Sequence, residues 1–480
     1  MGQDIASSHF SSADFAAFAA RLRSETEQLE QWFAHAELSE APPVGGLELE
    51  AWLTDTEWRP FARNGELLAQ LQDELVTTEL SRFNVELNAN PQPLRADGLG
   101  RMERGLAATW DRCSHAASEL DAHLLAIGIL PTAVESDFGL DTMTPSARYA
   151  ALNEQVLRQR DGQPLHIHIE GAEQLRTDHD DLMLESATTS FQIHMQVPAS
   201  RAADYFNAAI LVSGPMVAVA ANSPYLFGHD LWAETRVPLF EQAVEVGGIG
   251  AAAHGPQRRV GFGTGYARES VAECFRENLE HFPVLLPMVH DGAEADPMAH
   301  LQLHNGTIWR WNRPLIGIGP DGERHVRIEH RVVPGGPTVS DAIANAALFF
   351  GLVQYYAHDA NWPPSQLLSF PQARDNFYAC ARRGLDARVA WSDGVTHDVA
   401  QLLEEHLLPS ARLGLRDLGL DPAEIEHYLS IARERIRGRQ NGAAWQRAWV
   451  ARHGRDMRAL TAAYGERQAS GRPVHEWSLR

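Results

Sequence analysis

The chain has 480 residues and a formal net charge of −22, with 44% hydrophobic and 22% charged residues. This composition is ordinary for a soluble globular protein with a large core, and the negative charge argues against nucleic acid or an anionic membrane as a partner. All 41 basic residues are arginine, which excludes a phosphate-loop lysine, a kinase-type lysine and a pyridoxal Schiff base. Any phosphate chemistry therefore depends on arginine, backbone amides and metal ions.

The cysteines and apolar segments indicate a cytoplasmic protein. Cys113, Cys274 and Cys380 lie far apart, a pattern that fits a reducing compartment and excludes a four-thiolate zinc site. The N-terminus lacks the basic and then apolar pattern of a secretory signal. The longest nearly apolar run, residues 208–221, is interrupted by Gly-Pro and is too short to span a bilayer.

The first predicted elements are a helix and a strand. Residues 12–38 have helical periodicity, and Ser11 with Asp14 forms a weak capping box. After the breaker "APPVGG", the stretch "GGLELEAWLTD" predicts a strand. Glu48 and Glu50 share one face of it, ~6–7 Å apart, and leucines take the other face.

Later strand-like segments alternate in the same way. They are "RFNVELNANP" (82–91), "PLHIHIEG" (164–171), "TTSFQIHMQVP" (188–198) and "HVRIEHRVV" (325–333). Strands with one polar and one apolar face, separated by helices, predict an α+β fold in which a curved antiparallel sheet is backed by helices. From about residue 339 the pattern is mostly helical, and the eight arginines from Arg433 to Arg458 predict a solvated helix face rather than a nucleic-acid patch.

Three other motifs carry weaker signals. "GFGTG" (261–265) lacks the context of a known phosphate loop, so we expect a plain turn. His166 and His168 could be a metal pair, although two histidines in a polar groove is the favoured interpretation. His300 and His304 lack the intervening glutamate of a zinc-protease helix and are expected to be incidental.

The strongest signal is a set of acids on strands whose other face is apolar. They are Glu48, Glu50, Glu86 and Glu329. A single such acid is ordinarily solvated, but converging carboxylates repel each other and raise their pKa values unless cations neutralise them. Mg²⁺ prefers carboxylate oxygens, and arginines on the same segments can hold phosphate or carboxylate. An acid-lined metal site with arginines suits phosphoryl transfer from a nucleotide.

Six segments between Gly45 and Pro337 resemble motifs that occur in this order in one enzyme family. "GLELE" and "ELNANPQPL" resemble its two acidic strands, and "TTSFQIHMQV" resembles the strand that carries Gln-Val-Asn in the family, with His194 in the place of the asparagine. "ANSPYLFG" resembles its Asn-Ser-Pro-Phe loop, and "TIWRWNRP" a segment ending in a functional arginine. "RIEHRVVPGGP" resembles its Glu-x-Arg strand followed by Gly-Gly-Pro. The family is glutamate–cysteine ligase family 2, the plant and proteobacterial type in the glutamine synthetase-like superfamily of carboxylate–amine ligases.

The resemblance implies a glutamine synthetase-like fold, in which a curved sheet forms a funnel that holds two or three Mg²⁺ ions. The implied metal ligands are Glu48, Glu50, Glu86 and Glu329. The implied contacts to substrate or nucleotide are Gln192, His194, Asn88, Asn222 and Ser223, with His194 a possible contact to metal or phosphate. Arg313 and Arg331 would bind substrate carboxylate and acyl phosphate, and Arg236 would assist with phosphates.

The resemblance also implies the domains and the reaction. Residues 1–40 would be a helix on the catalytic domain, 41–340 that domain, and 341–480 a helical region of the same domain. The implied reaction joins glutamate to cysteine with ATP and Mg²⁺ through γ-glutamyl phosphate, as in glutathione biosynthesis. A ligase for a different carboxylate or amine, a guanidino kinase and a catalytically silent binding protein stay open as alternatives, although a silent protein has no need to gather like charges. The expected partners are small molecules only.

Overall fold

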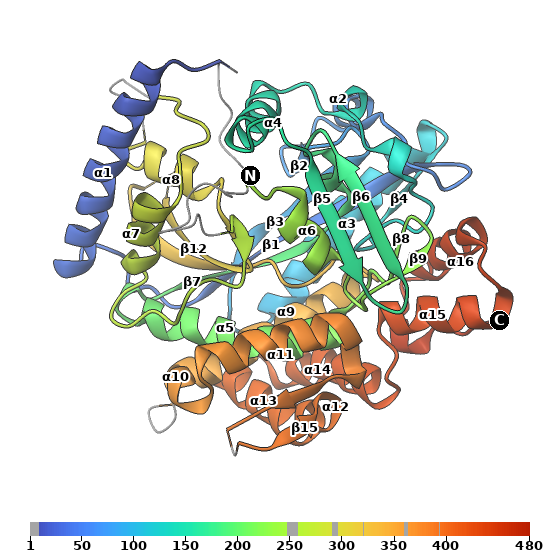
Figure 1. Ribbon diagram of the computed structural model, residues 1–480. Coiled ribbons are helices and arrows are strands. Elements are labelled where there is room, and N and C mark those ends of the chain that lie inside the picture. Colours follow the sequence, from blue (N-terminus) through green and yellow to red (C-terminus); the bar gives the residue numbers. More distant parts are fainter. Residues whose placement is uncertain (1–8, 247–257, 290–295, 320, 360–362, 393) are drawn as a thin grey trace.

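A computed structural model describes residues 9–246, 258–289, 296–319, 321–359, 363–392 and 394–480 of the chain. Within these residues, seven strands form one antiparallel sheet in the order β12-β13-β7-β1-β3-β2, with β4 paired to β1 (Figure 1). Their bounds are β1 Val44–Asp55, β2 Val76–Thr78, β3 Asn84–Pro93, β4 Ala122–Leu125, β7 Phe191–Val197, β12 Asn312–Ile318 and β13 Arg324–His330. The predicted curved antiparallel sheet is confirmed, and its strands β2, β4 and β12 were not predicted.

The register of the sheet places the predicted acids on one face. Glu50 pairs with Glu86 across β1 and β3. Glu48 pairs with Gln192 across β1 and β7, and β13 adds its own acid opposite the histidine of β7. Because side chains alternate along a strand, these residues all point to the same side. A shift by one residue in any strand would turn its acids into the core.

The apolar face of the sheet is covered by helices. Leu47, Leu49, Ile193 and Ile328 on this face are all buried. Helix α5 (Ala202–Ala220) packs against β12 and β13, and α9 (Val339–His358) packs against β7. Below them in Figure 1 lie α11 (Phe370–Arg383), α13 (Leu408–Asp417) and α14 (Pro422–Arg437). The helical C-terminal region therefore encloses the same core as the sheet.

The remaining helices surround the sheet, except for α10 and α12, which lie among the lower helices (Figure 1). They include α2 Asn64–Leu71, α3 Gly98–Glu119, α4 Ala147–Gln159, α6 Arg236–Ala243, α7 Ala272–His281, α8 Ala299–Asn305, α10 Pro364–Leu367, α12 Val399–Leu402, α15 Gly442–His453 and α16 Met457–Ala469.

The first helix is confirmed and is shorter than predicted. Helix α1 spans Ser12–Ala34 with the capping box between Ser11 and Asp14 in place, and it packs against α7 and α8. The chain leaves the helix at Ala36, whose φ of 53° is incompatible with a further helical turn. Residues 35–38, which were predicted as helical, therefore belong to the following loop.

One predicted strand lies in a different place. Residues 164–171 alternate as expected, but β5 (Leu165–Glu170) pairs only with β6 (Gln174–His179) in a separate hairpin. Its histidines are exposed: His166 contacts Asp178, and His168 contacts Glu170 and Gln174. The polar groove predicted for them is a surface hairpin, because alternation identifies a strand but not its partner.

Helix α5 is also the one described helix long and apolar enough, by composition, to cross a membrane. The relevant window is 89% buried inside the protein. The helix lies between the sheet and the lower helices (Figure 1), so it serves as a core helix.

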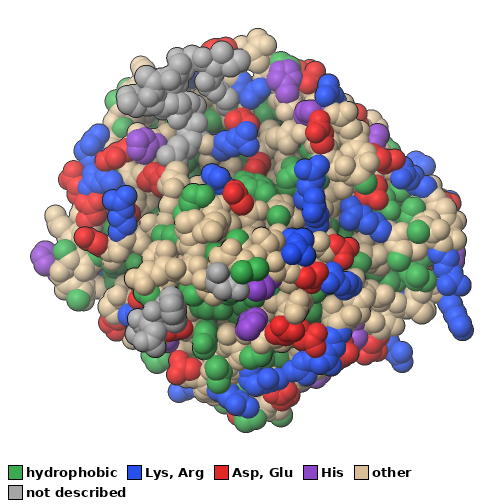
Figure 2. All heavy atoms as spheres, turned by 60° about the horizontal axis from the view of Figure 1, so that its bottom comes forward, with side chains coloured by type: hydrophobic (Ala, Val, Ile, Leu, Met, Phe, Trp, Pro, Cys, Tyr) green, Lys and Arg blue, Asp and Glu red, His purple; other side chains and the backbone are tan. Residues whose placement is uncertain are grey.

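The C-terminal arginines face acids of the same chain. Seven of the eight arginines from 433 to 458 lie within 4.0 Å of a carboxylate. Arg435 departs from the predicted solvated face, because it is buried against Asp341 at 2.7 Å. On the face seen in Figure 2, acidic and arginine side chains are interspersed.

Candidate active site

The polar face of the sheet lines a cavity of about 950 Å³. Six strands of the sheet (β1, β2, β3, β7, β12 and β13) contribute to its floor, and α4, α8 and the loops before β3 and β7 contribute to its walls. The charged residues that line it are Glu48, Glu50, Glu79, Glu86, Arg148, Glu185, His194, Asp296, Arg313, Arg327, Glu329 and Arg331. The four acids predicted from the sequence therefore converge in one place.

The first group of potential metal ligands consists of Glu48, His194 and Glu329. One ligand atom of each lies within 4.8 Å of the others, and His194 Nε2 lies 3.2 Å from Glu48 Oε1. Neither buried ring nitrogen of His194 has a well-aligned hydrogen-bond partner in the described chain. Burial would raise the pKa of Glu48, but His194 and Arg331 lower it below its usual value, so this carboxylate stays ionised.

Two arginines hold Glu329 ionised. Arg313 donates from Nε and Nη2 to its two carboxylate oxygens, at 2.8 and 2.9 Å, and Arg331 Nη1 lies 3.4 Å away. Burial opposes ionisation, yet these arginines lower the pKa of Glu329 to about 2. A bidentate pair also fixes the orientation of the carboxylate. Arg313 is therefore largely occupied by Glu329, while Arg331 extends into the cavity.

The second group consists of Glu50, Glu79 and Glu86, again within 4.8 Å of one another. Burial and the charge of Glu48 raise the pKa of Glu86. Burial, Glu86 and Glu50 raise that of Glu79 well above its usual value. In the described part of the chain, no arginine or histidine forms an ion pair with Glu79 or Glu86. The second group therefore gathers the negative charge that a metal ion requires, and no positively charged side chain of the described residues forms an ion pair with Glu79 or Glu86.

Glu50 is oriented by the strand beside it. Its carboxylate accepts hydrogen bonds from Ser190 N and Oγ at 2.6 and 2.8 Å, and from Gln192 Nε2 at 2.8 Å. Gln192 in turn accepts a hydrogen bond from Arg331 Nη1. These bonds fix the orientation of the Glu50 carboxylate and link the second acidic group to Arg331.

Both groups fit divalent cations. In the second group, the raised pKa values of Glu79 and Glu86 would be relieved most directly by a hard cation. In the first group, His194 Nε2 lies 3.2 Å from Glu48 without a well-aligned hydrogen bond, so the ring is available as a ligand beside two carboxylates. The four acids predicted as metal ligands all belong to these two groups, and Glu79 completes the second group. Glu79 and Glu185 were missed because they lie outside alternating strands, in "VTTELS" and "MLESA". Only their position beside the cavity identifies them.

Asn88 lies beside the cavity, where its Nδ2 donates to Glu86 Oε1 at 3.0 Å. It therefore orients an acid of the second group. A direct contact to substrate or nucleotide stays a prediction.

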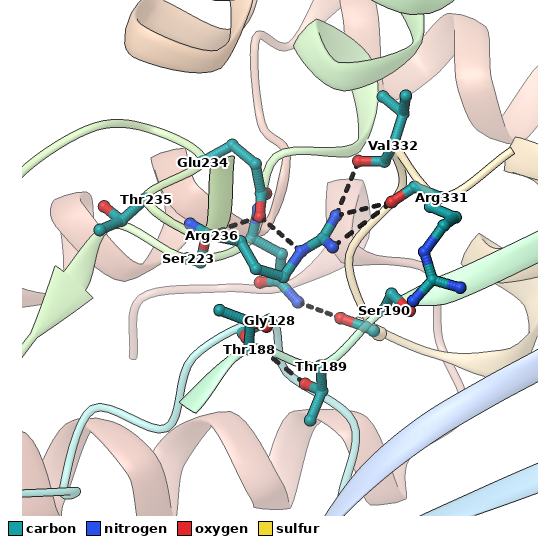
Figure 3. Close-up of polar contacts among 12 residues, drawn as sticks. Gly128, Thr188, Thr189, Ser190, Ser223, Glu234, Thr235, Arg236, Arg331 and Val332 are labelled. Atoms are coloured by element: carbon teal, nitrogen blue, oxygen red, sulfur yellow. Dashed lines mark hydrogen bonds and ion pairs between the residues drawn. The ribbon is translucent and has the colours of Figure 1, made fainter. Parts of the chain in front are cut away.

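Arg236, Asn222 and Ser223 are buried and do not line the cavity within the described residues. Arg236 Nε donates to Glu234 Oε1 at 3.0 Å, and Nη2 donates to Val332 O at 2.8 Å. Figure 3 shows its guanidinium directed at the main chain of Arg331 and Val332. Arg236 therefore contacts the site through the backbone of Arg331.

Asn222 and Ser223 belong to the same buried network. Ser223 Oγ donates to Glu234 Oε1 at 2.7 Å, and Asn222 Nδ2 donates to Gly335 O at 2.8 Å. Gly335 follows the arginine-bearing strand and precedes a cis Gly336-Pro337 bond. The network thus fixes the turn after β13, and contacts of these two residues to the nucleotide stay predictions.

A family model confirms that the motifs are those of the family named from the sequence. The model of glutamate-cysteine ligase family 2 matches residues 44–468. The chain belongs to this family. It is accordingly an ATP-dependent ligase that joins a carboxylate to an amine. The match extends well beyond Pro337, where the recognisable motifs end, and includes the helices under the sheet.

A solved structure agrees on the fold of this family member. A glutamate–cysteine ligase from Francisella tularensis, in complex with AMP, superposes with a TM-score of 0.57 and 11% identity, over 92% of this chain and 91% of that one. A bifunctional glutathione synthetase from Pasteurella multocida gives a TM-score of 0.48 and 11% identity, over 93% of this chain and 55% of that one. No curated protein matches the chain.

The weaker motifs lie away from the acidic groups of the ligase. Residues 261–265 begin at the end of the two-residue strand β10 (Val260–Gly261) and are otherwise irregular. His300 contacts Glu25, and His304 faces Asn278 O at 3.0 Å inside the protein. Both histidines are therefore accounted for by packing, as expected.

Proposed function

We propose that this family member is a glutamate–cysteine ligase that uses ATP and Mg²⁺ and forms γ-glutamyl phosphate as an intermediate, in the cytoplasm. The observation that carries the proposal is the meeting of two acidic groups in one cavity with Arg313 and Arg331. Such a site combines cation binding with recognition of carboxylate and phosphate.

The metals would be held by Glu48, His194 and Glu329 in one group and by Glu50, Glu79 and Glu86 in the other. When bound, Mg²⁺ offsets the charge of the phosphates during transfer. Glu329 is already oriented by Arg313, and Glu50 by Ser190 and Gln192. The chain therefore presents pre-positioned carboxylates, which is the protein's main contribution to a phosphoryl-transfer site.

The reaction follows from the weakness of a carboxylate as an acyl donor. A γ-carboxylate oxygen of glutamate would attack the γ-phosphorus of ATP, and ADP would leave. The amine nitrogen of cysteine would then attack the acyl carbon. The carbon–oxygen bond would break, and inorganic phosphate and a proton would be released. Arg331, whose side chain lines the cavity, would supply positive charge to a substrate carboxylate or to the acyl phosphate.

The experiment is a coupled ADP-release assay with Mg²⁺ and glutamate against a panel of amines, with mass spectrometry of the products. The proposal expects release with cysteine and a product of the mass of γ-glutamylcysteine. Release with another amine would make the chain a ligase of different specificity, and release with a guanidino compound without an amide would make it a kinase. No release with any of them, together with unchanged nucleotide binding in Glu329→Gln, would overturn the ligase chemistry.

A further inference from the structure

Glu185 lines the cavity, and its carboxylate has no hydrogen-bond or ion-pair partner among the described residues. It lies in the 3₁₀ turn Met183–Ala187, and its main-chain oxygen accepts hydrogen bonds from Thr188 N and Oγ1 at 3.0 and 2.9 Å. Its backbone is thus fixed. Its half-buried carboxylate lines the cavity, and no hydrogen bond or ion pair reaches it from the described residues.

Glu185 lies outside the two groups argued above to hold metals. The two groups able to hold a metal are Glu48 with His194 and Glu329, and Glu50 with Glu79 and Glu86. Glu185 belongs to neither group. Burial and the charge of Glu50 raise the pKa of Glu185 to about 8, while Arg331 lowers it. An ammonium group of a substrate arriving beside it would favour its charged form.

Arg331 provides the opposite charge in the same cavity. Its Nη1 donates to Gln192, whereas Nε and Nη2 have no hydrogen-bond partner within the described chain. Glu185 and Arg331 influence each other's pKa but do not form an ion pair within 4.0 Å. An unpartnered acid and a partly unpartnered guanidinium thus face one cavity without neutralising each other.

We propose that Glu185 and Arg331 together bind the head group of an α-amino acid, with Glu185 taking the α-ammonium and Arg331 the α-carboxylate. The inference rests on the proposed function for the identity of the amino acid. Both glutamate and cysteine carry this head group, so the shared chemistry defines the subsite. Glu185 is then a specificity residue that rejects acids without an amino group, because its half-buried carboxylate would be left without a partner.

Calorimetric binding to the full chain tests the subsite independently of turnover. The probes are L-glutamate, glutarate and L-cysteine, in Mg²⁺ with a non-hydrolysable ATP analogue. The variants are Glu185→Gln, which keeps the shape, Glu185→Asp, and the exposed control Glu27→Gln. Loss of one charge-assisted hydrogen bond predicts about a 10- to 100-fold weaker affinity in Glu185→Gln, with smaller loss in Glu185→Asp and none in the control.

The arms of the experiment distinguish the two amino acids. If the head group is that of glutamate, the preference of wild type for glutamate over glutarate disappears in Glu185→Gln while glutarate affinity is unchanged. If it is that of cysteine, only cysteine affinity falls. Unchanged affinity for both amino acids overturns the inference, and so does a loss confined to Mg²⁺ affinity. A chain that binds amino acids in this way but releases no ADP with any amine would refute the proposed function and leave the subsite standing.

Discussion

Arg236 donates hydrogen bonds to the main-chain carbonyl of Arg331, at 3.4 Å from both Nη1 and Nη2. The Arg331 side chain extends away from this guanidinium (Figure 3) and reaches Gln192. Arg236 is itself held by the buried acid Glu234 and lies 5.6 Å from the ring of Trp311. It is therefore a positioning residue, and its effect on activity should pass through Arg331.

A double-mutant cycle tests this relationship. We expect Arg236→Met and Arg331→Met each to lower kcat/KM by about 10- to 100-fold, and the double variant to be at most about 3-fold worse than the poorer single variant, because both remove one function. Steady-state ADP release measures all four proteins. Multiplicative losses would show instead that Arg236 contacts the substrates by itself.

Arg236→Met also leaves Glu234 as a buried unpaired charge, which costs ~3–5 kcal/mol of stability. The control is therefore Glu234→Gln combined with Arg236→Met, which removes both charges. Its activity should equal that of Arg236→Met, while its unfolding midpoint in urea should be higher.

The acids of the second group should favour Mg²⁺ binding and, by repelling each other, destabilise the protein when no metal is bound. Glu79→Gln removes one of three clustered acids, so we expect Mg²⁺ affinity to fall at least 10-fold by calorimetry. In EDTA the same variant should unfold at the same temperature as wild type or higher, because repulsion is relieved. Saturating Mg²⁺ should reverse the order. The control Glu27→Gln should follow wild type in both conditions, and a Glu79→Gln protein with wild-type Mg²⁺ affinity would remove Glu79 from the site.

Glu241 should make stability depend on pH. Burial raises its pKa from 4.5 to about 6, although hydrogen bonds from Trp311 and Tyr378 oppose the shift. The folded state therefore holds a proton where the unfolded state has lost it, so this contribution to stability falls as pH rises from 4.5 to about 6 and is level above. The free energy of unfolding should lose ~2 kcal/mol over this pH interval through Glu241.

Urea unfolding at pH 4.5, 6 and 7.5 measures this dependence. The free energy of unfolding of wild type, relative to Glu241→Gln, should fall over the first interval and stay constant over the second. Glutamine keeps an acceptor for Trp311 and Tyr378, whose donors lie 2.9 and 2.8 Å from Glu241 Oε1. A difference that does not change with pH would contradict the raised pKa.

Asn222 should act on stability more than on nucleotide binding. It is fully buried, and its side chain bonds Gly335 O, Tyr464 Oη and Gln446 Nε2 at 2.8, 2.8 and 3.0 Å. Asn222→Ala leaves these groups unsatisfied, so we expect a loss of ~2–4 kcal/mol in urea unfolding. The affinity of the folded fraction for a non-hydrolysable ATP analogue should change less than 3-fold. A loss of nucleotide affinity without loss of stability would instead support the contact predicted from the motif.

The alternating strands were predictable because burial on one face imposes a two-residue period on the sequence. Glu48, Glu50, Glu86 and Glu329 could be selected on that ground, and register then brought them together. Alternation could not tell that residues 165–170 form a separate hairpin, because it does not specify a strand's partner. Glu79 and Glu185 carry no period, so nothing local distinguishes them from surface acids.

Composition and local pattern by themselves determined that phosphate chemistry must use arginine and metal, and which strands have a polar face. Tertiary structure alone decided which arginine enters the cavity and which supports it. Arg331 and Arg236 both belong to motif segments, but the neighbours of Arg236 are Glu234 and backbone carbonyls that a linear motif does not specify. A side chain's role depends on the groups that meet it in space, and long-range pairing of the strands and of the turn after β13 sets those neighbours.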